Sequence, residues 1–266
     1  MENMTHPLTH ATAAEVRHAC RGGQHELPTS GLALGHVQAN LVILPKKHAF
    51  DFLLFCVRNP KPCPILEVTE PGCWEARMTA PGSDLRVDLP RYAIYRSGKL
   101  VEEPTDIKEV WKDDFVAFLL GCSFTFEKAL LQAGLPLRHL EEGKNVPMYR
   151  TDAPCQPAGI FHGNLVVSMR PMTPRQAIQA TLICQRFPHA HGAPVYFGDG
   201  AGLGIQDLAK PDYGEAVTIH AGEVPVFWAC GVTPQNVLRQ AKPPLAITHA
   251  PGHMFVTDMR DEDATV

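Results

Sequence analysis

The sequence predicts an α/β fold, because strand-like and helix-like stretches alternate along most of its 266 residues. Short apolar runs end at proline or glycine, as in HVQANLVILP (36–45) and VPVFWACG (224–231). Stretches with helix-start residues follow such runs. The clearest is TPRQAIQATLICQRF (173–187), in which Thr173 is a candidate N-cap and Pro174 the first helical residue. This order favours a mostly parallel or mixed sheet.

The first third of the chain is expected to alternate helix and strand. A helix is predicted at 12–21, where Thr12 can cap the first turn and Glu15 can complete a capping box. Strands are predicted at 36–45 and 65–72. A second helix lies between them at 47–59, and its apolar stripe is assigned to four residues: Phe50, Leu53, Leu54 and Val57.

The middle third is expected to begin with a hairpin. RYAIYRSGKLV (91–101) predicts two strands that turn at Ser97-Gly98. Asp113 or Asp114 is then expected to cap a helix that runs through FVAFLLGCSFTFEKALLQAG and is interrupted at Gly121.

The last third returns to strand–loop–helix order. The strand at 164–172 precedes the helix at 173–187, and the strand at 224–231 precedes a helix that Thr233 is expected to cap. PLAITHAPGHMFVTD (244–258) predicts a strand, a loop and a final strand. We place an inserted domain at 86–185 and a main domain at 1–85 plus 186–266.

The composition excludes several classes of function. The formal net charge of −4 leaves no basic footprint for nucleic acid. No segment reaches the roughly 18 apolar residues of a membrane span, and the N-terminus lacks the pattern of a secretory signal. The eight cysteines include no C-x-x-C pair, so we expect reduced thiols and a cytoplasmic protein. No cofactor is indicated, and the oligomeric state is open, a homo-oligomer included.

Four glycines follow one another closely in PVYFGDGAGLGI (194–205). The spacing does not fit the G-x-G-x-x-G motif of dinucleotide-binding loops, and no Gly-Lys-Ser/Thr follows as in a Walker loop. Two interpretations remain. The segment is either a flexible turn, or a loop whose backbone amides approach a small anion with Asp199 alongside.

THAPGHMF (248–255) places His249 and His253 four residues apart. Pro251-Gly252 lies between them and prevents the helix that would align two imidazoles on a metal ion. A turn whose histidines form hydrogen bonds or line a pocket is therefore favoured over a metal site, and no metal is expected.

GCSFTFE (121–127) places a thiol and a hydroxyl, those of Cys122 and Ser123, at the break in the predicted helix. If a second helix starts here, its N-terminal amides would lower the pKa of Cys122. A buried structural cysteine is the alternative.

Arginines at strand edges and turns are candidates for binding an anionic small molecule, because a guanidinium binds a carboxylate in a bidentate manner. They occur in LPRYAIYR, VPMYRT and SMRPM, and are Arg91, Arg96, Arg150 and Arg170. Each taken singly is more often one partner of a surface ion pair.

Several of these stretches together resemble the D-glutamate cyclase family, whose bacterial members are named hydro-lyases. The resemblance covers about residues 35–258 and includes NPKPCPILEVTEPG, FLLGCSFTFE, NVPMYRT, FHGNLVVSMRPM, RFPHAHGAPVYFGD and ITHAPGHMFVTD. The resemblance implies a three-layer α/β/α domain with a smaller two-layer α/β domain. It also implies a carbon–oxygen lyase that converts D-glutamate to 5-oxo-D-proline and water, or acts on a related small carboxylate.

The residues in these segments suggest roles in that reaction. Arg150 and Arg170 are expected to hold carboxylates, with Arg91 and Tyr149 as further substrate-binding residues. Cys122 and Ser123 would supply hydrogen-bond donors, with a thioester at Cys122 as an option. The candidates for the acid or base are Glu127, Asp199 and His253. Two alternatives stay open, a different hydro-lyase that dehydrates a hydroxy acid and a non-catalytic protein that binds a small carboxylate.

Overall fold

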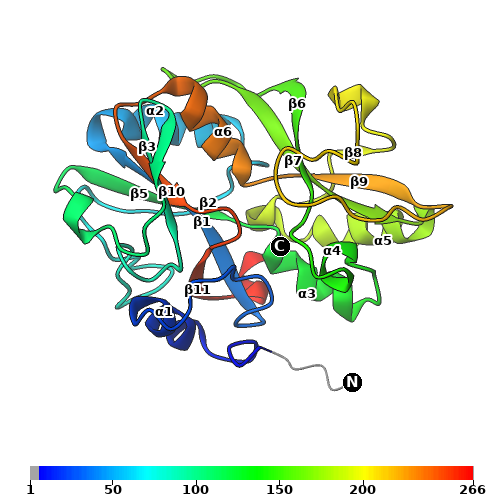
Figure 1. The fold of residues 1–266 in the computed structure, drawn as a ribbon, viewed down its shortest axis with the longest axis horizontal. Helices are drawn as coiled ribbons and strands as arrows, with labels where there is room; N and C mark the ends of the chain where they lie inside the picture. The colour runs from blue at the N-terminus through cyan, green and yellow to red at the C-terminus, as the bar shows by residue number, and fades with distance from the viewer. Residues whose placement is uncertain (1–5, 266) are drawn as a thin grey trace.

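The structure is a computed structural model that describes residues 6–265 (Figure 1). Its strands form two sheets, the large sheet and the small sheet, which lie on opposite sides of the molecule in Figure 1. All pairs between the described strands are antiparallel. The mixed α/β class is thus confirmed, whereas the predicted parallel or mixed sheet is wrong. The three-layer arrangement with an inserted domain stays a prediction.

The large sheet has seven strands in the order β2-β5-β1-β10-β3-β4, with β11 paired to β1. Their bounds are β1 His36–Pro45, β2 Ile65–Val68, β3 Tyr92–Arg96, β4 Lys99–Glu102, β5 Phe115–Gly121, β10 Ala246–His249 and β11 Phe255–Arg260. The small sheet has the order β6-β7-β9-β8. Its strands are β6 Met148–Pro154, β7 Asn164–Met172, β8 Tyr196–Phe197 and β9 Val224–Ala229.

Each sheet combines strands from separate parts of the chain. β3, β4 and β5 lie within residues 86–185 but pair in the large sheet. β8 and β9 lie after residue 185 but pair with β7 in the small sheet.

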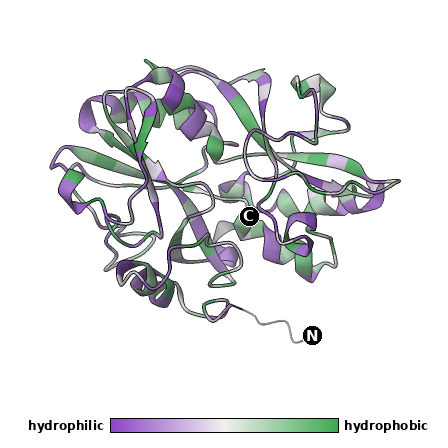
Figure 2. Cartoon of the chain, viewed as in Figure 1, coloured by the Kyte–Doolittle hydropathy of each residue, from purple (hydrophilic) through white to green (hydrophobic). Residues whose placement is uncertain are grey.

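The helices are α1 Ala13–Arg21, α2 Lys46–Arg58, α3 Phe124–Gln132, α4 Arg138–Glu141, α5 Pro174–Cys184 and α6 Val232–Ala241. The predicted caps of the first and fifth are confirmed, since Thr12 and Thr173 each form a capping box. The predicted hairpin is also present, with Ser97 and Gly98 at φ of 49° and 78° in its turn. Apolar residues concentrate in the strands of both sheets (Figure 2).

The predicted helix at 115–121 is wrong, because this segment is strand β5. Its residues are buried on both faces of the large sheet: Phe118 and Leu120 pack in one core, and Ala117 and Leu119 in the other. A strand covered on both sides carries a continuous apolar run, and such a run lacks the alternation that identifies most strands. Neither Asp113 nor Asp114 therefore caps a helix here.

Two details of the other helices also differ from the predictions. In α2 the buried side chains are Phe52, Phe55 and Cys56, whereas Phe50 is 72% exposed and Val57 61% exposed. In α6 the N-cap is Gly231, not Thr233. The Thr233 hydroxyl instead accepts from the Val166 N–H at 3.0 Å, so it joins the helix to β7.

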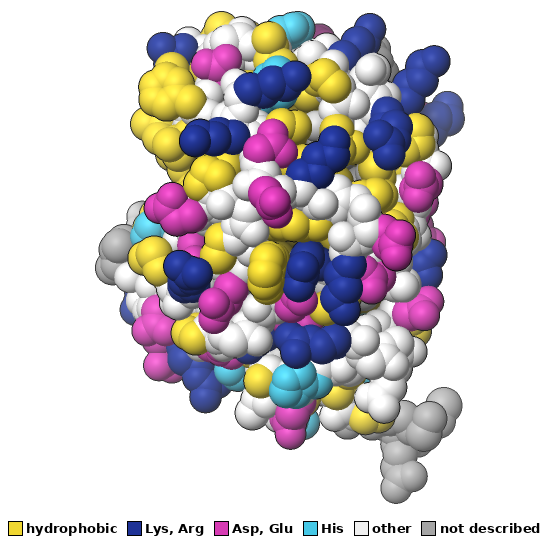
Figure 3. Space-filling view, turned by 90° about the vertical axis from the view of Figure 1, so that its left-hand side faces the viewer, with side chains coloured by type: hydrophobic (Ala, Val, Ile, Leu, Met, Phe, Trp, Pro, Cys, Tyr) yellow, Lys and Arg dark blue, Asp and Glu magenta, His cyan; other side chains and the backbone are white. Residues whose placement is uncertain are grey.

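The charged side chains on one face of the molecule are of both signs and interspersed (Figure 3). Within residues 6–265, no helix combines the length and the apolar character that crossing a bilayer requires.

Candidate active site

Two segments of similar design connect an inner strand to a helix. In the first, Cys122 follows β5, and α3 begins at Phe124. In the second, Cys230 follows β9, and α6 begins at Val232. We call them the β5–α3 unit and the β9–α6 unit.

Each unit crosses from one sheet to the other. β5 belongs to the large sheet, but Phe126 and Leu130 of α3 pack with Trp228 of the small sheet. β9 belongs to the small sheet, but Val237 and Leu238 of α6 pack against the core of the large sheet. The chain therefore changes sheet at α3 and at α6. α2 and α5 do connect strands of one sheet, but an antiparallel strand separates the two, β5 between β1 and β2 and β9 between β7 and β8, so no parallel pair forms among the described strands.

The two crossing points share one narrow pocket with a cavity volume of about 30 Å³. Residues 122–124 and 230–232 contribute to its lining from the two units, together with Asn40 of β1 and His249 of β10. Asn145, Val146, Met148, Gly252 and Met254 complete the lining. The pocket thus lies where both sheets and both units meet.

The two thiols are buried but border this pocket. Cys122 is 7% exposed and Cys230 is 8% exposed. Burial raises the pKa of Cys122 to about 12 and that of Cys230 to about 11. The Phe124 amide acts to lower the pKa of Cys122, and the Val232 amide acts to lower that of Cys230, but both effects are smaller than that of burial. The expectation that a helix N-terminus lowers the pKa of Cys122 is therefore wrong, because desolvation is the larger effect.

Both helices begin without a side-chain cap. Ser123 occupies the N-cap of α3 and Gly231 that of α6, and neither position supplies a side-chain hydrogen bond to the first turn. The Thr125 and Thr233 amides donate to the Cys122 and Cys230 carbonyls at 3.2 Å and 3.0 Å, so the positive end of each helix dipole is what favours a bound anion here. Since both starts line one pocket, it offers two places for negative groups.

Asn40 joins the two units. Its Nδ2 donates to the Gly121 carbonyl at 2.7 Å, and its side chain packs so closely on Gly231 that an added Cβ there would lie 2.3 Å from Oδ1. The side chain is 3% exposed, and within the described residues Oδ1 accepts no side-chain or backbone hydrogen bond. It therefore presents a free acceptor at the pocket wall.

His249 is the histidine of the pocket. Its Nε2 lies 3.3 Å from the Gln235 amide nitrogen, which is a donor, so Nε2 is the accepting nitrogen and Nδ1 carries the proton, 3.3 Å from the Leu41 carbonyl oxygen. Burial lowers the pKa of His249 to about 4, so the imidazole is neutral at neutral pH.

A buried charged cluster supports the start of α3. Arg170 is 0% exposed, and its guanidinium pairs with Glu127, with further hydrogen bonds to Ser168 at 3.1 Å and Ser123 at 3.3 Å. Nε2 of His139 lies 3.2 Å from the same Glu127 oxygen, although its orientation does not form a hydrogen bond. The effect of His139 on Glu127 is therefore electrostatic.

Burial acts to raise the pKa of Glu127, but Arg170 and His139 together lower it to about 2. The carboxylate is therefore ionised and paired at neutral pH, and it does not serve as a proton acceptor there. Arg170 also acts electrostatically to lower the pKa of both Cys122 and Cys230. The Arg170 side chain does not line the pocket, so its charge acts on the two thiols through the intervening protein.

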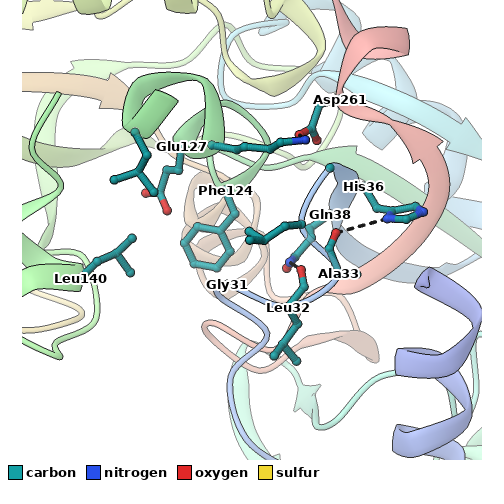
Figure 4. A pocket seen from close by; sticks show the side chains of 13 residues that line it. Gly31, Leu32, Ala33, His36, Gln38, Phe124, Glu127, Leu140 and Asp261 are labelled. Carbon is teal, nitrogen blue, oxygen red and sulfur yellow. Dashed lines mark hydrogen bonds and ion pairs between the residues drawn. The ribbon is translucent and has the colours of Figure 1, made fainter. Parts of the chain in front are cut away.

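A second pocket, with a cavity volume of about 60 Å³, shares Phe124 with the first (Figure 4). Glu127 reaches it from α3, and Asp261 reaches it from the C-terminal segment. Burial raises the pKa of Asp261 to about 6, with Lys128 3.9 Å away as its partner.

Four residues that the sequence predicts for one site lie close together. Cys122 and Ser123 line the pocket, and Arg170 contacts both Ser123 and Glu127. Tyr149 faces away from the pocket, because its strand neighbour Met148 lines it and successive side chains alternate. The Tyr149 hydroxyl donates to the Leu208 carbonyl at 2.7 Å in a separate core.

Other predicted residues lie outside the pocket lining. Arg91 contacts Glu26 at 3.3 Å, and Arg150 stacks on Tyr213 with its charge in solvent. Asp199 is exposed and accepts from the Ala201 N–H at 3.0 Å, which closes a local turn in the glycine loop.

His253 lies in the loop that contributes Gly252 and Met254 to the pocket, but its side chain is directed to the Pro251 carbonyl, 2.9 Å from Nδ1. Within residues 6–265, no group of three His, Cys, Asp or Glu side chains is arranged to hold a metal ion.

Sequence reasoning missed Asn40, Cys230 and His249 as residues of the site. One signal was present. Both GCSF (121–124) and ACGV (229–232) place a cysteine beside a glycine at the end of an apolar run, directly before a helix. His249 had been named as a histidine that forms hydrogen bonds or lines a pocket but was not assigned to this site, and Asn40 gave no signal, because it lies in the middle of a buried strand.

Fold and site together define a two-sheet α/β protein with a thiol-lined pocket between the sheets. The family model described as D-glutamate cyclase matches residues 116–258, which contain both units. Two curated proteins that bear the name "Putative hydro-lyase" are similar over almost their whole length. The one from Stutzerimonas stutzeri is 60% identical over 95% of this chain and 96% of its own. The one from Rubrobacter xylanophilus is 61% identical over 96% and 98%. The chain belongs to the D-glutamate cyclase family.

Among solved structures, a nitrogen repressor-like protein from Methanococcus jannaschii aligns over 95% of this chain and 96% of its own. The TM-score is 0.38 and the sequence identity is 11%, so this similarity establishes neither a shared fold nor a shared function.

Proposed function

We propose that the pocket between the two units cyclises D-glutamate, or a closely related small amino acid with two carboxylates, and releases water. The observation that carries this proposal is that two uncapped helix starts and two thiols border one pocket. Membership of the D-glutamate cyclase family and the hydro-lyase names of the relatives support it.

The reaction transfers protons within the substrate. The ammonium loses two protons, its nitrogen forms a bond to the γ-carboxyl carbon, and one carboxyl oxygen leaves with both protons as water. The net charge of the substrate does not change. The pocket must therefore bind two anionic groups, accept the ammonium, and pass protons from nitrogen to oxygen.

The helix starts and Asn40 suit the two binding tasks. One carboxylate would lie at the positive end of the α3 dipole and the other at the positive end of the α6 dipole. The free Oδ1 of Asn40 would accept from the ammonium. Holding both ends of the molecule brings nitrogen and carbonyl carbon together, which makes ring closure an oriented intramolecular step.

The thiols and His249 suit proton transfer. Cys122 and Cys230 are protonated at neutral pH, so each can donate to a carboxyl oxygen. Neutral His249 carries its proton on Nδ1, toward the Leu41 carbonyl, and has Nε2 as its acceptor beside Gln235. A thioester at Cys122 is the covalent variant of this scheme, and it would require the thiol to lose its proton first.

Arg170 acts in this scheme as a positioning residue, because it holds Ser123 and lies behind the thiols. Glu127 acts in the same way, as the buried partner of Arg170. Arg91, Tyr149, Arg150, Asp199 and His253 have no contact with this pocket in the scheme. A small carboxylate is the proposed partner of the protein.

The test measures 5-oxo-D-proline formed from D-glutamate by chiral chromatography, for the wild type and for Cys122→Ser. We expect a loss of about 100-fold or more in the variant, the size of a general acid–base contribution. Cys73→Ser is the control, since Cys73 is a half-buried cysteine outside the pocket. Equal rates for wild type and Cys122→Ser would refute the assignment of the site.

A related hydro-lyase reaction, the dehydration of a hydroxy acid, fits the reaction class in the names of the relatives. Product analysis with hydroxy acids alongside D-glutamate separates the two. Calorimetry that shows carboxylate binding without any product would favour a binding protein instead.

A further inference from the structure

The narrow pocket that the two thiols border has room for about two water molecules, because its cavity volume is about 30 Å³. A larger cleft with a cavity volume of about 350 Å³ adjoins it, and the two share Phe124, Asn145 and Gly252 in their linings. We call this larger space the outer cleft. We infer that the substrate reaches the thiols through the outer cleft, and that the ring of Phe124 is the gate between the cleft and the narrow pocket. This inference rests on the substrate class of the proposed function.

The outer cleft has the size and the polar groups that a small amino acid requires. Pockets for small ligands usually measure about 300–1,000 Å³. The polar residues of the lining are Ser30, His139, Lys144, Asn145 and Glu215. Nζ of Lys144 donates to Glu142 at 2.7 Å and to the Ala216 carbonyl at 2.8 Å, which leaves its third N–H without an acceptor among the described residues. Lys144 and Glu215 thus offer charges of both signs, which suits a zwitterionic ligand.

Phe124 stands where three cavities meet. The narrow pocket, the outer cleft and the second pocket all have Phe124 in their linings, and it is the residue that all three share. Figure 4 shows its ring projecting among the residues that line the second pocket. Because one ring borders all three spaces, a change in its side-chain torsions would join the narrow pocket to the larger cleft beside it.

The surroundings of the ring allow such a movement. Phe124 is half-buried, although Ser123 and Thr125 on either side of it are buried. Among the described residues, its ring belongs to none of the hydrophobic core clusters and pairs with no other aromatic ring. A ring with few packing partners can change its rotamer at a small cost in free energy.

The other two shared residues are held in place through their backbones. The Asn145 N–H donates to a Glu215 carboxylate oxygen at 3.3 Å, and the Asn145 carbonyl accepts from the Glu215 N–H at 3.2 Å. The Gly252 carbonyl accepts from the Thr29 N–H at 2.9 Å. These hydrogen bonds oppose movement of both segments, so the Phe124 ring is the part of the boundary that can open.

The experiment measures the rate at which iodoacetamide alkylates each cysteine of the purified protein, by mass spectrometry of its peptides. We expect Phe124→Ala to speed the alkylation of Cys122 and Cys230 by about 10-fold or more, because the rate at a buried group follows the free energy of opening the path to it. Phe50→Ala is the control, since Phe50 is 72% exposed on α2, and it should leave both rates unchanged. Ser30→Leu adds bulk to the outer cleft and should slow both.

The outcomes separate this inference from the proposed function. Unchanged alkylation in Phe124→Ala or in Ser30→Leu overturns the inference. Equal acceleration at Cys184, which is buried in another core, also overturns it, because that result would indicate a general loosening of the fold. Alkylation does not require turnover, so it decides the inference even if the wild type forms no 5-oxo-D-proline, a result that refutes only the proposed function. Phe124→Leu, with the same expected direction, replaces Phe124→Ala if thermal unfolding shows that the alanine variant does not fold.

Discussion

Replacing Glu127 by glutamine tests whether the buried charged cluster supports the site as described. The substitution keeps the size of the side chain but removes the charge that pairs with Arg170. Arg170 is 0% exposed, so no solvent replaces the lost partner. Removing one member of a buried pair typically costs about 3–5 kcal/mol.

The pKa of Glu127 gives a second estimate. It falls from an ordinary 4.5 to about 2 in the folded protein. A difference of about 2.5 units corresponds to about 3 kcal/mol of stability. Because the folded pKa is the lower one, this stability is present above pH about 4.5 and is lost as the pH falls toward about 2. We therefore expect Glu127→Gln to lower the free energy of unfolding by about 3 kcal/mol at pH 7, and by progressively less in more acidic solution.

Urea unfolding of wild type and Glu127→Gln at a series of pH values between 7 and 3 measures this difference. Glu141→Gln is the control, because Glu141 pairs with Arg138 through a side chain that is half exposed, and we expect a change below about 0.5 kcal/mol. A Glu127→Gln variant as stable as the wild type at pH 7, or a difference that grows in acid, would refute the reasoning.

Three further predictions concern the pocket and its surroundings. Gly231→Ala should lower the free energy of unfolding by about 1–3 kcal/mol and abolish activity, because the new Cβ would lie 2.2 Å from Nδ2 of Asn40. Urea unfolding and the 5-oxoproline assay check this. Adding Asn40→Ala to the same variant should recover part of the lost stability. His249→Gln should reduce the loss of folding stability that occurs between pH 6.5 and pH 4. The folded pKa of His249 is lowered from 6.5 to about 4, so the wild type loses stability as the pH falls through this range, and the variant has no such group. The same pH dependence of unfolding in both proteins would contradict this. Arg150→Ala should leave 5-oxoproline formation within about twofold of the wild type, because the Arg150 guanidinium stacks on Tyr213 in solvent; a large loss of rate would place the site elsewhere.

The sequence predicted local structure correctly where the residues that start a helix were clear. Thr12 with Glu15 and Thr173 with Gln176 form the capping boxes that fix two helix starts. β5 was the exception, because a strand buried on both faces has no alternation to distinguish it from a helix.

Strand direction did not follow from the sequence. A helix between two strands predicts a parallel pair only if both strands are neighbours in one sheet. Here α3 and α6 each lead to the other sheet, and the strands that α2 and α5 connect are separated by β5 and by β9. Which sheet a helix covers depends on long-range packing, and no short segment encodes it.

The same crossing explains which site residues were predictable. Cys122 and Ser123 stood at a visible break in an apolar run, and the structure places both at the pocket. Cys230 reaches the pocket only because the second unit meets the first there. Arg150 carried a suitable charge in a suitable segment, but its strand directs it to solvent.

The measurement that tests the central claim most directly is a crystal structure with 5-oxo-D-proline bound. The account predicts the ligand between the two units, with its carboxylate at the positive end of the α3 or the α6 dipole and its ring beside Cys122 or Cys230. A ligand bound instead at Arg150 and Tyr213, or at Asp199 in the glycine loop, would contradict it.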